Sequence, residues 1–135
     1  MSVQAKAFGI EVRLAAPLDE TIERTRAALK AEGFGVLTEI DVKKTLREKL
    51  DAEFRPYVIL GACNPQLAQR ALTAELDIGL LLPCNVIAYQ SDDGGSVVVA
   101  MDPEAALGIV PNPAIEPIAR EAKERLTRAL EFLTL

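Results

Sequence analysis

Two short segments, LGACNP at residues 60–65 and LLPCNV at residues 81–86, contain the two cysteines of the chain, and an asparagine follows each one. The sequence has no histidine. Thiolates are nucleophiles and soft metal ligands, so Cys63 and Cys84 are candidates for redox, nucleophilic or metal chemistry. Together with Asn64 and Asn85 they are also the candidate residues for ligand binding.

The position of Cys63 favours a thiolate, because this residue lies where an apolar strand ends and a helix begins. Backbone N–H groups at a helix start and the positive end of its dipole stabilise negative charge. In a redox protein Cys63 would be the attacking thiolate and Cys84 the resolving partner, which requires a Cα–Cα distance under about 7 Å. The two thiolates also suit Cu(I) or Zn(II), but carboxylates or a second subunit would have to complete the ligand set.

The simplest interpretation of both cysteines is packing, since free cysteine is commonly buried and behaves as a small hydrophobe. Asn64 followed by Pro65 is typical of a helix N-cap and first turn. Asn85 borders an apolar strand, where a buried amide needs hydrogen-bond partners, so it either ties down a loop or points into a pocket. The two thiols are neighbours only if the strands at 57–62 and 84–90 run antiparallel.

Other chemistry has little support in the sequence. Glu39 and Asp41, two residues apart at a strand end, form a weak candidate for a carboxylate pair, because Asp41 is also a plausible helix cap. The absence of histidine excludes triads that use an imidazole base. The GFG segment at 33–35 lacks the further glycine spacing of a phosphate-binding loop. The lack of these catalytic groups counts against a conventional hydrolase and leaves open whether the protein is an enzyme.

Composition indicates a soluble globular protein of 135 residues, long enough for a single domain over 1–135. Half of the residues are hydrophobic, but the chain has two Tyr, four Phe and no Trp, which predicts an aliphatic core without a stacking platform for bases. The net charge of −5 argues against nucleic-acid binding. The N-terminus does not resemble a signal peptide and the most apolar run, 78–88, is too short to span a bilayer. We therefore expect a cytoplasmic protein with free thiols.

Hydrophobic periodicity and turn residues predict strands at 8–14, 35–40, 57–62, 84–90 and 96–101, and helices at 17–32, 42–50, 65–74 and 114–133, with one helical turn after Asp102 and Pro103. The continuously apolar strand at 57–62 is predicted to be buried on both faces. The segment SDDGG at 91–95 is typical of a hairpin. The order of elements predicts an α+β fold, in which helices pack on one face of an antiparallel β-sheet.

Three blocks, GFGVLTEIDVKKTL, YVILGACNP and IGLLLPCNV, resemble in order and spacing the bacterial and archaeal family known as domain of unknown function 302, over about residues 9–135. The motif residues of this family fall on Gly33, Gly35, Thr38, Asp41, Gly61, Cys63, Asn64, Pro65, Pro83, Cys84 and Asn85. The resemblance implies a TATA-box-binding-protein-like fold of the β-α-β-β-α-β-β-α type and a homodimer. It implies no DNA binding and no established activity.

These observations favour a non-catalytic binding module. In this hypothesis the turns at 61–65 and 82–86 line a pocket or a dimer seam that holds a small apolar ligand or a partner protein. The alternatives are a thiol redox protein and a soft-metal protein, both using Cys63 and Cys84.

Overall fold

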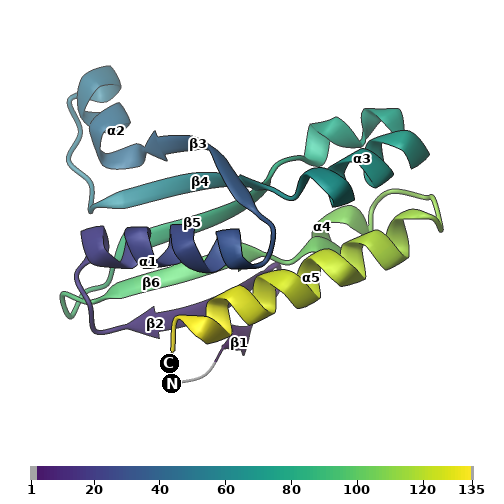
Figure 1. Ribbon diagram of the computed structural model, residues 1–135. Helices are drawn as coiled ribbons and strands as arrows, with labels where there is room; N and C mark the ends of the chain where they lie inside the picture. The colour runs from purple at the N-terminus through teal and green to yellow at the C-terminus, as the bar shows by residue number, and fades with distance from the viewer. Residues whose placement is uncertain (1–2, 135) are drawn as a thin grey trace.

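The computed structural model describes residues 3–134. Its elements are, in chain order, β1 (Gln4–Ala5), β2 (Gly9–Leu14), α1 (Leu18–Ala31), β3 (Gly35–Asp41), α2 (Val42–Leu50), β4 (Tyr57–Cys63), α3 (Pro65–Ala74), the 3-10 helix η1 (Leu76–Leu81), β5 (Cys84–Gln90), β6 (Ser96–Met101), α4 (Pro103–Leu107) and α5 (Ile115–Phe132). The strands form one antiparallel sheet in the order β1-β2-β6-β5-β4-β3. Helices α1 and α5 cross one face of this sheet (Figure 1), which confirms the predicted α+β class.

Side-chain caps fix the starts of three helices. The carboxylate of Asp41 accepts a hydrogen bond from the N–H of Lys44 at 2.9 Å and begins α2. The amide oxygen of Asn64 accepts one from the N–H of Leu67 at 3.2 Å and begins α3. Asp102 caps α4 through two backbone N–H groups. All three sequence predictions about these helix starts are confirmed.

Strands β5 and β6 form the predicted hairpin. The register pairs Gln90 with Ser96, and the N–H of Ser91 donates to the carbonyl of Gly95 at 2.9 Å. Gly94 has a φ of 88°, a left-handed conformation that glycine adopts without a steric penalty. The turn thus returns the chain so that β5 and β6 lie side by side.

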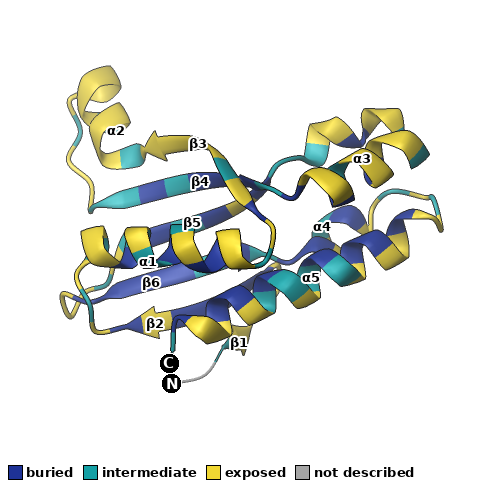
Figure 2. Cartoon of the chain, viewed as in Figure 1, coloured by how far each residue is buried: buried dark blue, intermediate teal, exposed yellow. Residues whose placement is uncertain are grey.

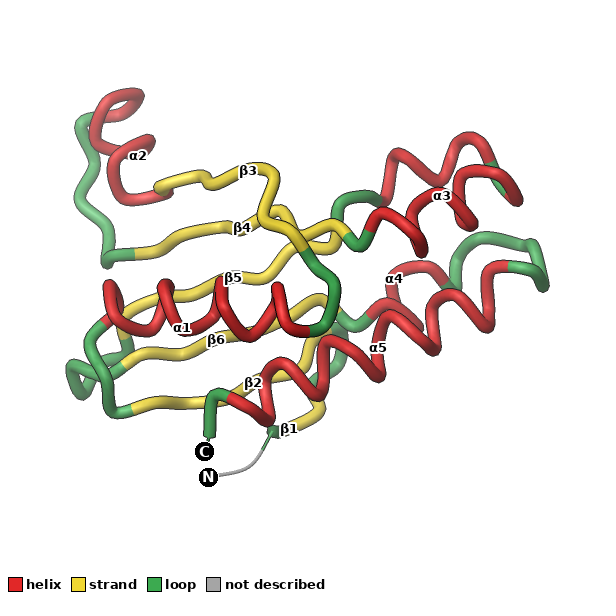
Figure 3. The backbone as a smooth tube through the Cα atoms, in the orientation of Figure 1, coloured by secondary structure: helices red, strands yellow, loops and turns green. Residues whose placement is uncertain are grey.

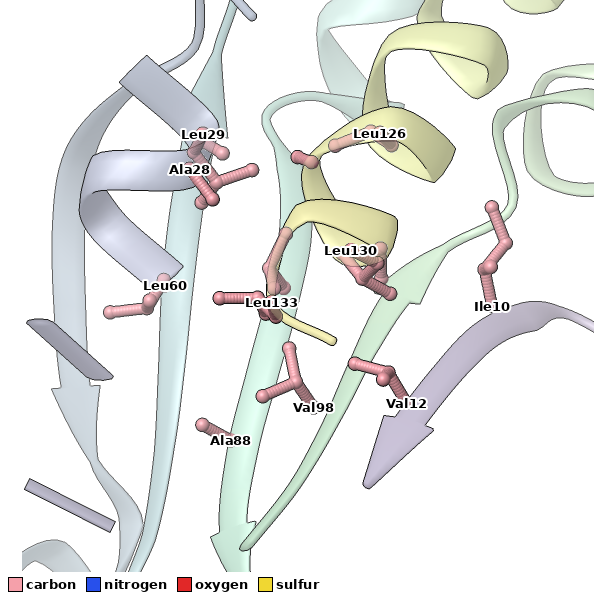
Figure 4. Close-up of a cluster of buried hydrophobic side chains, with 14 of the residues drawn as sticks. Ile10, Val12, Ala28, Leu29, Leu60, Ala88, Val98, Leu126, Leu130 and Leu133 are labelled. Carbon is pink, nitrogen blue, oxygen red and sulfur yellow. The ribbon is translucent and has the colours of Figure 1, made fainter. Parts of the chain in front are cut away.

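The main core lies between the sheet and the two helices that cross it. Every second strand residue points toward the helices, because side chains alternate between the faces of a sheet. In Figure 4 Val12, Leu60 and Val98 on the strands face Leu29 of α1 and Leu130 of α5. The cluster is aliphatic apart from Phe34 and Cys84, as the composition predicts.

A second, smaller core lies beyond one end of the sheet. Its buried members are Leu67, Ala71, Ile78, Leu107, Ile115, Ile118, Ala119 and Ala122. They come from α3, η1, α4 and the first half of α5, which lie together on the right in Figure 1. Figure 2 shows buried and exposed residues alternating along α5, so one amphipathic helix contributes to both cores.

Three features differ from the prediction. The two-residue strand β1 and the 3-10 helix η1 were not expected. The prediction that the strand at 57–62 is buried on both faces is wrong for one face, because Tyr57 and Ile59 are only half-buried. The helices cover the opposite face, where Val58, Leu60 and Ala62 are buried. No helix among residues 3–134 is long and apolar enough to cross a membrane.

Candidate functional site

An apolar cavity of about 290 Å³ lies between the two cores, where β4 leads into α3. Figure 3 shows α3 continuing from β4, with α4 and α5 below it. The lining residues are Phe34, Leu37, Ala62, Cys63, Asn64, Leu67, Ala68, Ala71, Leu72, Gly79, Leu82, Pro83, Cys84, Leu107, Ile118 and Ala122. None of these side chains is charged, so the wall offers contact area and few polar groups.

The first Cys-Asn segment positions one side of this cavity. Cys63 is the last residue of β4 and is half-buried, and Asn64 is buried while its amide oxygen caps α3. Pro65 in the first turn of α3 has no N–H to leave unsatisfied. The segment therefore turns the chain sharply from strand to helix at the cavity wall.

The second Cys-Asn segment supplies the opposite side. The helix η1 ends before Leu82, the peptide bond between Leu82 and Pro83 is cis, and Cys84 begins β5. Because β4 and β5 are antiparallel and Ala62 pairs with Cys84, the two cysteines lie one residue apart in register on neighbouring strands. The antiparallel arrangement on which the proximity of the thiols depended is confirmed.

The two thiols have different surroundings. Both thiols are free. Cys84 is buried in the main core, which also contains the paired residues Leu60 of β4 and Val86 of β5. Burial, with a smaller effect of the nearby Cys63, raises the pKa of the Cys84 thiol from its ordinary 9.0 to about 11. Cys84 is therefore a neutral thiol at physiological pH, which is the state of a packing residue rather than of an attacking thiolate.

Asn85 lies outside the cavity. It is exposed, and the alternation of β5 turns it to the face of the sheet opposite that of Cys84 and Val86. The structure thus brings three of the four candidate residues, Cys63, Asn64 and Cys84, to one cavity and separates Asn85 from them.

The weaker candidates, Glu39 and Asp41, both have structural roles. Asp41 serves as the cap of α2, and Glu39 forms an ion pair with Arg26 of α1, so both carboxylates have structural partners. Among residues 3–134 no group of three or more His, Cys, Asp or Glu side chains has the arrangement of a metal site. A metal bound through Cys63 and Cys84 would need ligands from another molecule.

The sequence analysis missed the leucines at the cavity. Leu37 and Leu72 line it, yet 69% and 37% of their surfaces are exposed. Leu76 and Leu80, on the helix that supplies Gly79 to the wall, are 81% and 88% exposed. Leu37 and Leu72 therefore add exposed apolar surface at the cavity. The signal in the sequence was the leucine-rich segment around residues 76–82, for which we predicted no element and no role.

Comparison with known proteins gives a family but no activity. Residues 10–133 match the family described as domain of unknown function DUF302. The chain is similar to the crystal structure of an uncharacterised conserved DUF302 protein from Bacillus stearothermophilus, with 39% sequence identity and a TM-score of 0.84. The similarity covers 91% of this chain and 95% of that one. No curated protein matches the chain.

Proposed function

Given that this chain belongs to the DUF302 family, whose description assigns no activity, we propose a function from its own geometry. It is a non-catalytic, homodimeric binding module of the cytoplasm whose cavity beside the two Cys-Asn segments holds a small apolar ligand. The observation that carries this proposal is the cavity itself, with an uncharged wall and exposed leucines at its margin. The free thiols of Cys63 and Cys84 suit a reducing compartment.

The apolar wall and the volume of the cavity restrict the charge and the size of the ligand. Transfer of apolar surface from water to an apolar wall is favourable by about 25 cal/mol per Å². A charged group would lose hydration here without gaining an ionic partner, so the buried part of the ligand is uncharged. A volume of about 290 Å³ is at the small end of ligand sites, which suits a short alkyl chain or one small ring system.

The same wall supports a binding role over a catalytic one. General acid–base catalysis needs a titratable group whose pKa lies near the working pH. The lining includes no carboxylate, lysine or arginine, and the pKa of Cys84 is raised to about 11. The amide oxygen of Asn64 is already engaged by the N–H of Leu67.

A substitution that fills the cavity tests the proposal. Ala68 lines the cavity from α3, so Ala68→Phe places a ring in the space that the ligand would occupy. We expect wild-type protein to bind the neutral naphthalene fluorophore 6-propionyl-2-(dimethylamino)naphthalene and the variant to bind it at least about 10-fold more weakly. Ala27→Phe, at an exposed position of α1 away from the cavity, is the matched control and should bind as the wild type does.

Native mass spectrometry of freshly purified protein gives an independent readout. We expect a retained ligand or a dimer in the wild-type spectrum. Equal fluorophore binding by both variants, together with a ligand-free and strictly monomeric mass, would count decisively against the proposal. Ala68→Leu is a milder filling substitution, should the phenylalanine variant fail to fold.

Thiol chemistry remains the alternative function, because two free thiols on neighbouring strands border one cavity. It predicts that iodoacetamide alkylates Cys63 at a pH well below the range in which an ordinary thiol ionises, or that a chelator increases its alkylation by removing Cu(I) or Zn(II). The binding proposal predicts that Cys84 stays protected until the protein unfolds and that a chelator changes neither rate. Peptide mass analysis reports each cysteine separately.

A further inference from the structure

The side-chain amide of Asn64 has an unused hydrogen-bond donor at the cavity. Its oxygen accepts from the N–H of Leu67 at 3.2 Å, whereas its nitrogen Nδ2 donates to no residue among 3–134. Asn64 is only 8% exposed and lines the cavity. Every fully enclosed polar side-chain atom that the structure describes has a partner, so Nδ2 borders open space, and the space beside this buried residue is the cavity. A ligand could therefore supply the acceptor that Nδ2 lacks.

A glycine brings a guanidinium group close to this amide. Gly33 lies in the turn between α1 and β3 with a φ of 87° (Figure 1). A Cβ at this position would lie 2.8 Å from Nδ2 of Asn64 and 3.8 Å from Nη1 of Arg125. Arg125 does not line the cavity, but Ala122, about one turn before it on α5, does. An amide and a guanidinium thus border one side of the cavity, and we call Gly33, Asn64 and Arg125 the donor corner.

The ion pairs around Arg125 leave positive charge at the donor corner. The carboxylate of Glu121 is shared by Arg70 and Arg125, each at 3.1 Å, while the carboxylate of Glu32 is paired with Arg128 at 3.0 Å. Nη1 of Arg125 also donates to the backbone carbonyl of Glu32 at 3.3 Å, which holds the guanidinium in place. These described contacts use two of its five N–H donors. An anion at the donor corner would therefore meet a positioned cation.

The start of α3 favours the same kind of group. This helix has ten residues and begins at Pro65, directly after Asn64. The N-terminus of a helix carries a partial positive charge that stabilises anions near its first turn. A carboxylate matches this field, and its two oxygens can accept hydrogen bonds from an amide and a guanidinium together.

We infer that the cavity binds a linear aliphatic carboxylate, whose chain lies along the apolar wall and whose head group accepts hydrogen bonds from Asn64 and Arg125. The inference rests on the proposed function and names the class of its ligand. The uncharged wall keeps the head group out of the interior, so only the chain enters and the carboxylate stays at the donor corner. An alkylammonium would be repelled there, and an alcohol would gain only neutral hydrogen bonds.

Three ligands with the same chain and different head groups test the assignment. They are decanoate, 1-decanol and decylamine, titrated at neutral pH below the concentrations at which they form micelles. In methyl NMR we expect wild-type protein to bind decanoate at least about 10-fold more tightly than 1-decanol, because charge-assisted hydrogen bonds are stronger than neutral ones. Decylamine should bind most weakly. The side-chain amide signals of Asn64 should shift more with decanoate than with 1-decanol.

Two variants separate the head group from the chain. Asn64→Asp replaces the donor by an oxygen but keeps the acceptor that caps α3, so the helix start is preserved. It should weaken decanoate binding at least about 10-fold and leave 1-decanol binding nearly unchanged. Arg125→Gln removes the positive charge and should weaken decanoate binding selectively as well. Arg120→Gln is the matched control, because Arg120 is an exposed arginine of the same helix outside the donor corner.

The possible results distinguish this inference from the proposed function. Equal affinities for decanoate and 1-decanol, or decanoate binding that Asn64→Asp and Arg125→Gln leave unchanged, would overturn the carboxylate assignment while the apolar cavity stands. Decylamine binding that is tighter than decanoate binding would overturn it too. The absence of a saturable shift with all three ligands would overturn the proposed function itself. Arg125→Gln provides the test should Asn64→Asp fail to fold.

Discussion

At the scale of single residues, burial explains why the Cys-Asn segments contain the residues they do. A methyl group at Gly61 would collide with the hydroxyl of Thr38 and lie 3.0 Å from Cγ of Pro83. Gly61, Thr38 and Pro83 therefore meet at one point, although they come from β4, β3 and the approach to β5. These three motif residues are explained by close packing beside the cavity, without any chemistry.

The buried thiol of Cys84 predicts a loss of stability in alkali. Well below pH 9 the thiol is protonated in both the folded and the unfolded chain, so it contributes no pH dependence. Above pH 9 the unfolded chain loses this proton while the folded chain keeps it to about pH 11, so the free energy of unfolding falls as the pH rises. The expected loss is about 2 kcal/mol between pH 8 and 10.5.

Urea denaturation of the wild type and of Cys84→Ala at these two pH values measures the effect. The substitution lowers stability at both values because it leaves a cavity, but it should remove about 2 kcal/mol of the alkaline decrease. Cys63→Ala serves as the comparison for a half-buried thiol. An alkaline decrease that is unchanged in Cys84→Ala would mean that the thiol ionises freely in the folded protein.

Sequence patterns predicted residue roles well where the role is local. The caps Asp41 and Asn64 depend on hydrogen bonds to N–H groups three residues ahead, so the sequence alone contains both partners. The orientation of Asn85 and the exposure of Leu37 and Leu72 depend on strands and helices distant in the chain. No local pattern distinguishes these leucines from core leucines.

At the scale of elements, the short helix α4 is held by one aspartate. The carboxylate of Asp102 accepts hydrogen bonds from the N–H groups of Glu104 and Ala105 and lies 3.0 Å from Nζ of Lys123 on α5. The hydrogen bond to Asp102 raises the pKa of Lys123. Because Leu107 of α4 lines the cavity, this cap also positions part of the cavity wall.

Removal of that cap should be more costly than removal of the cap of α2. We expect Asp102→Ala to lower the free energy of unfolding by about 2 kcal/mol, since Asp102 is buried and satisfies two N–H groups. Asp41→Ala, at an exposed helix that buries none of its residues, should cost about 0.5 kcal/mol. Urea denaturation compares the two, and equal losses would contradict the role assigned to α4.

Elements with strong periodicity were predicted from the sequence, and those without it were not. Helix α5 has an apolar stripe that repeats over its whole length, and β2 alternates cleanly. Strand β1 has two residues and η1 has 3-10 geometry, so neither gives a detectable period. The apolar strand at 57–62 was correctly located. Its sequence is typical of a strand buried on both faces, whereas the described chain covers only one face.

At the scale of the whole molecule, two cores produce the cavity. The sheet ends at Cys63 while α5 continues past it, and α3 packs against this extension instead of against the sheet. Arg70 of α3 reaches Glu121 of α5 at 3.1 Å, and Arg125 contacts the other oxygen of the same carboxylate. The cavity between the cores depends on these long-range contacts, so only its cysteines and asparagine were visible in the sequence.

Methyl NMR during a titration with 1-decanol tests the central claim, that this cavity binds an apolar ligand, most directly. The account predicts saturable shifts of the methyl groups of Leu72, Leu82 and Ile118, which line the cavity, while those of Ile59 and Ile87 on the other face of the sheet stay unchanged. Shifts confined to Ile59 and Ile87, or no saturable shift at all, would contradict it.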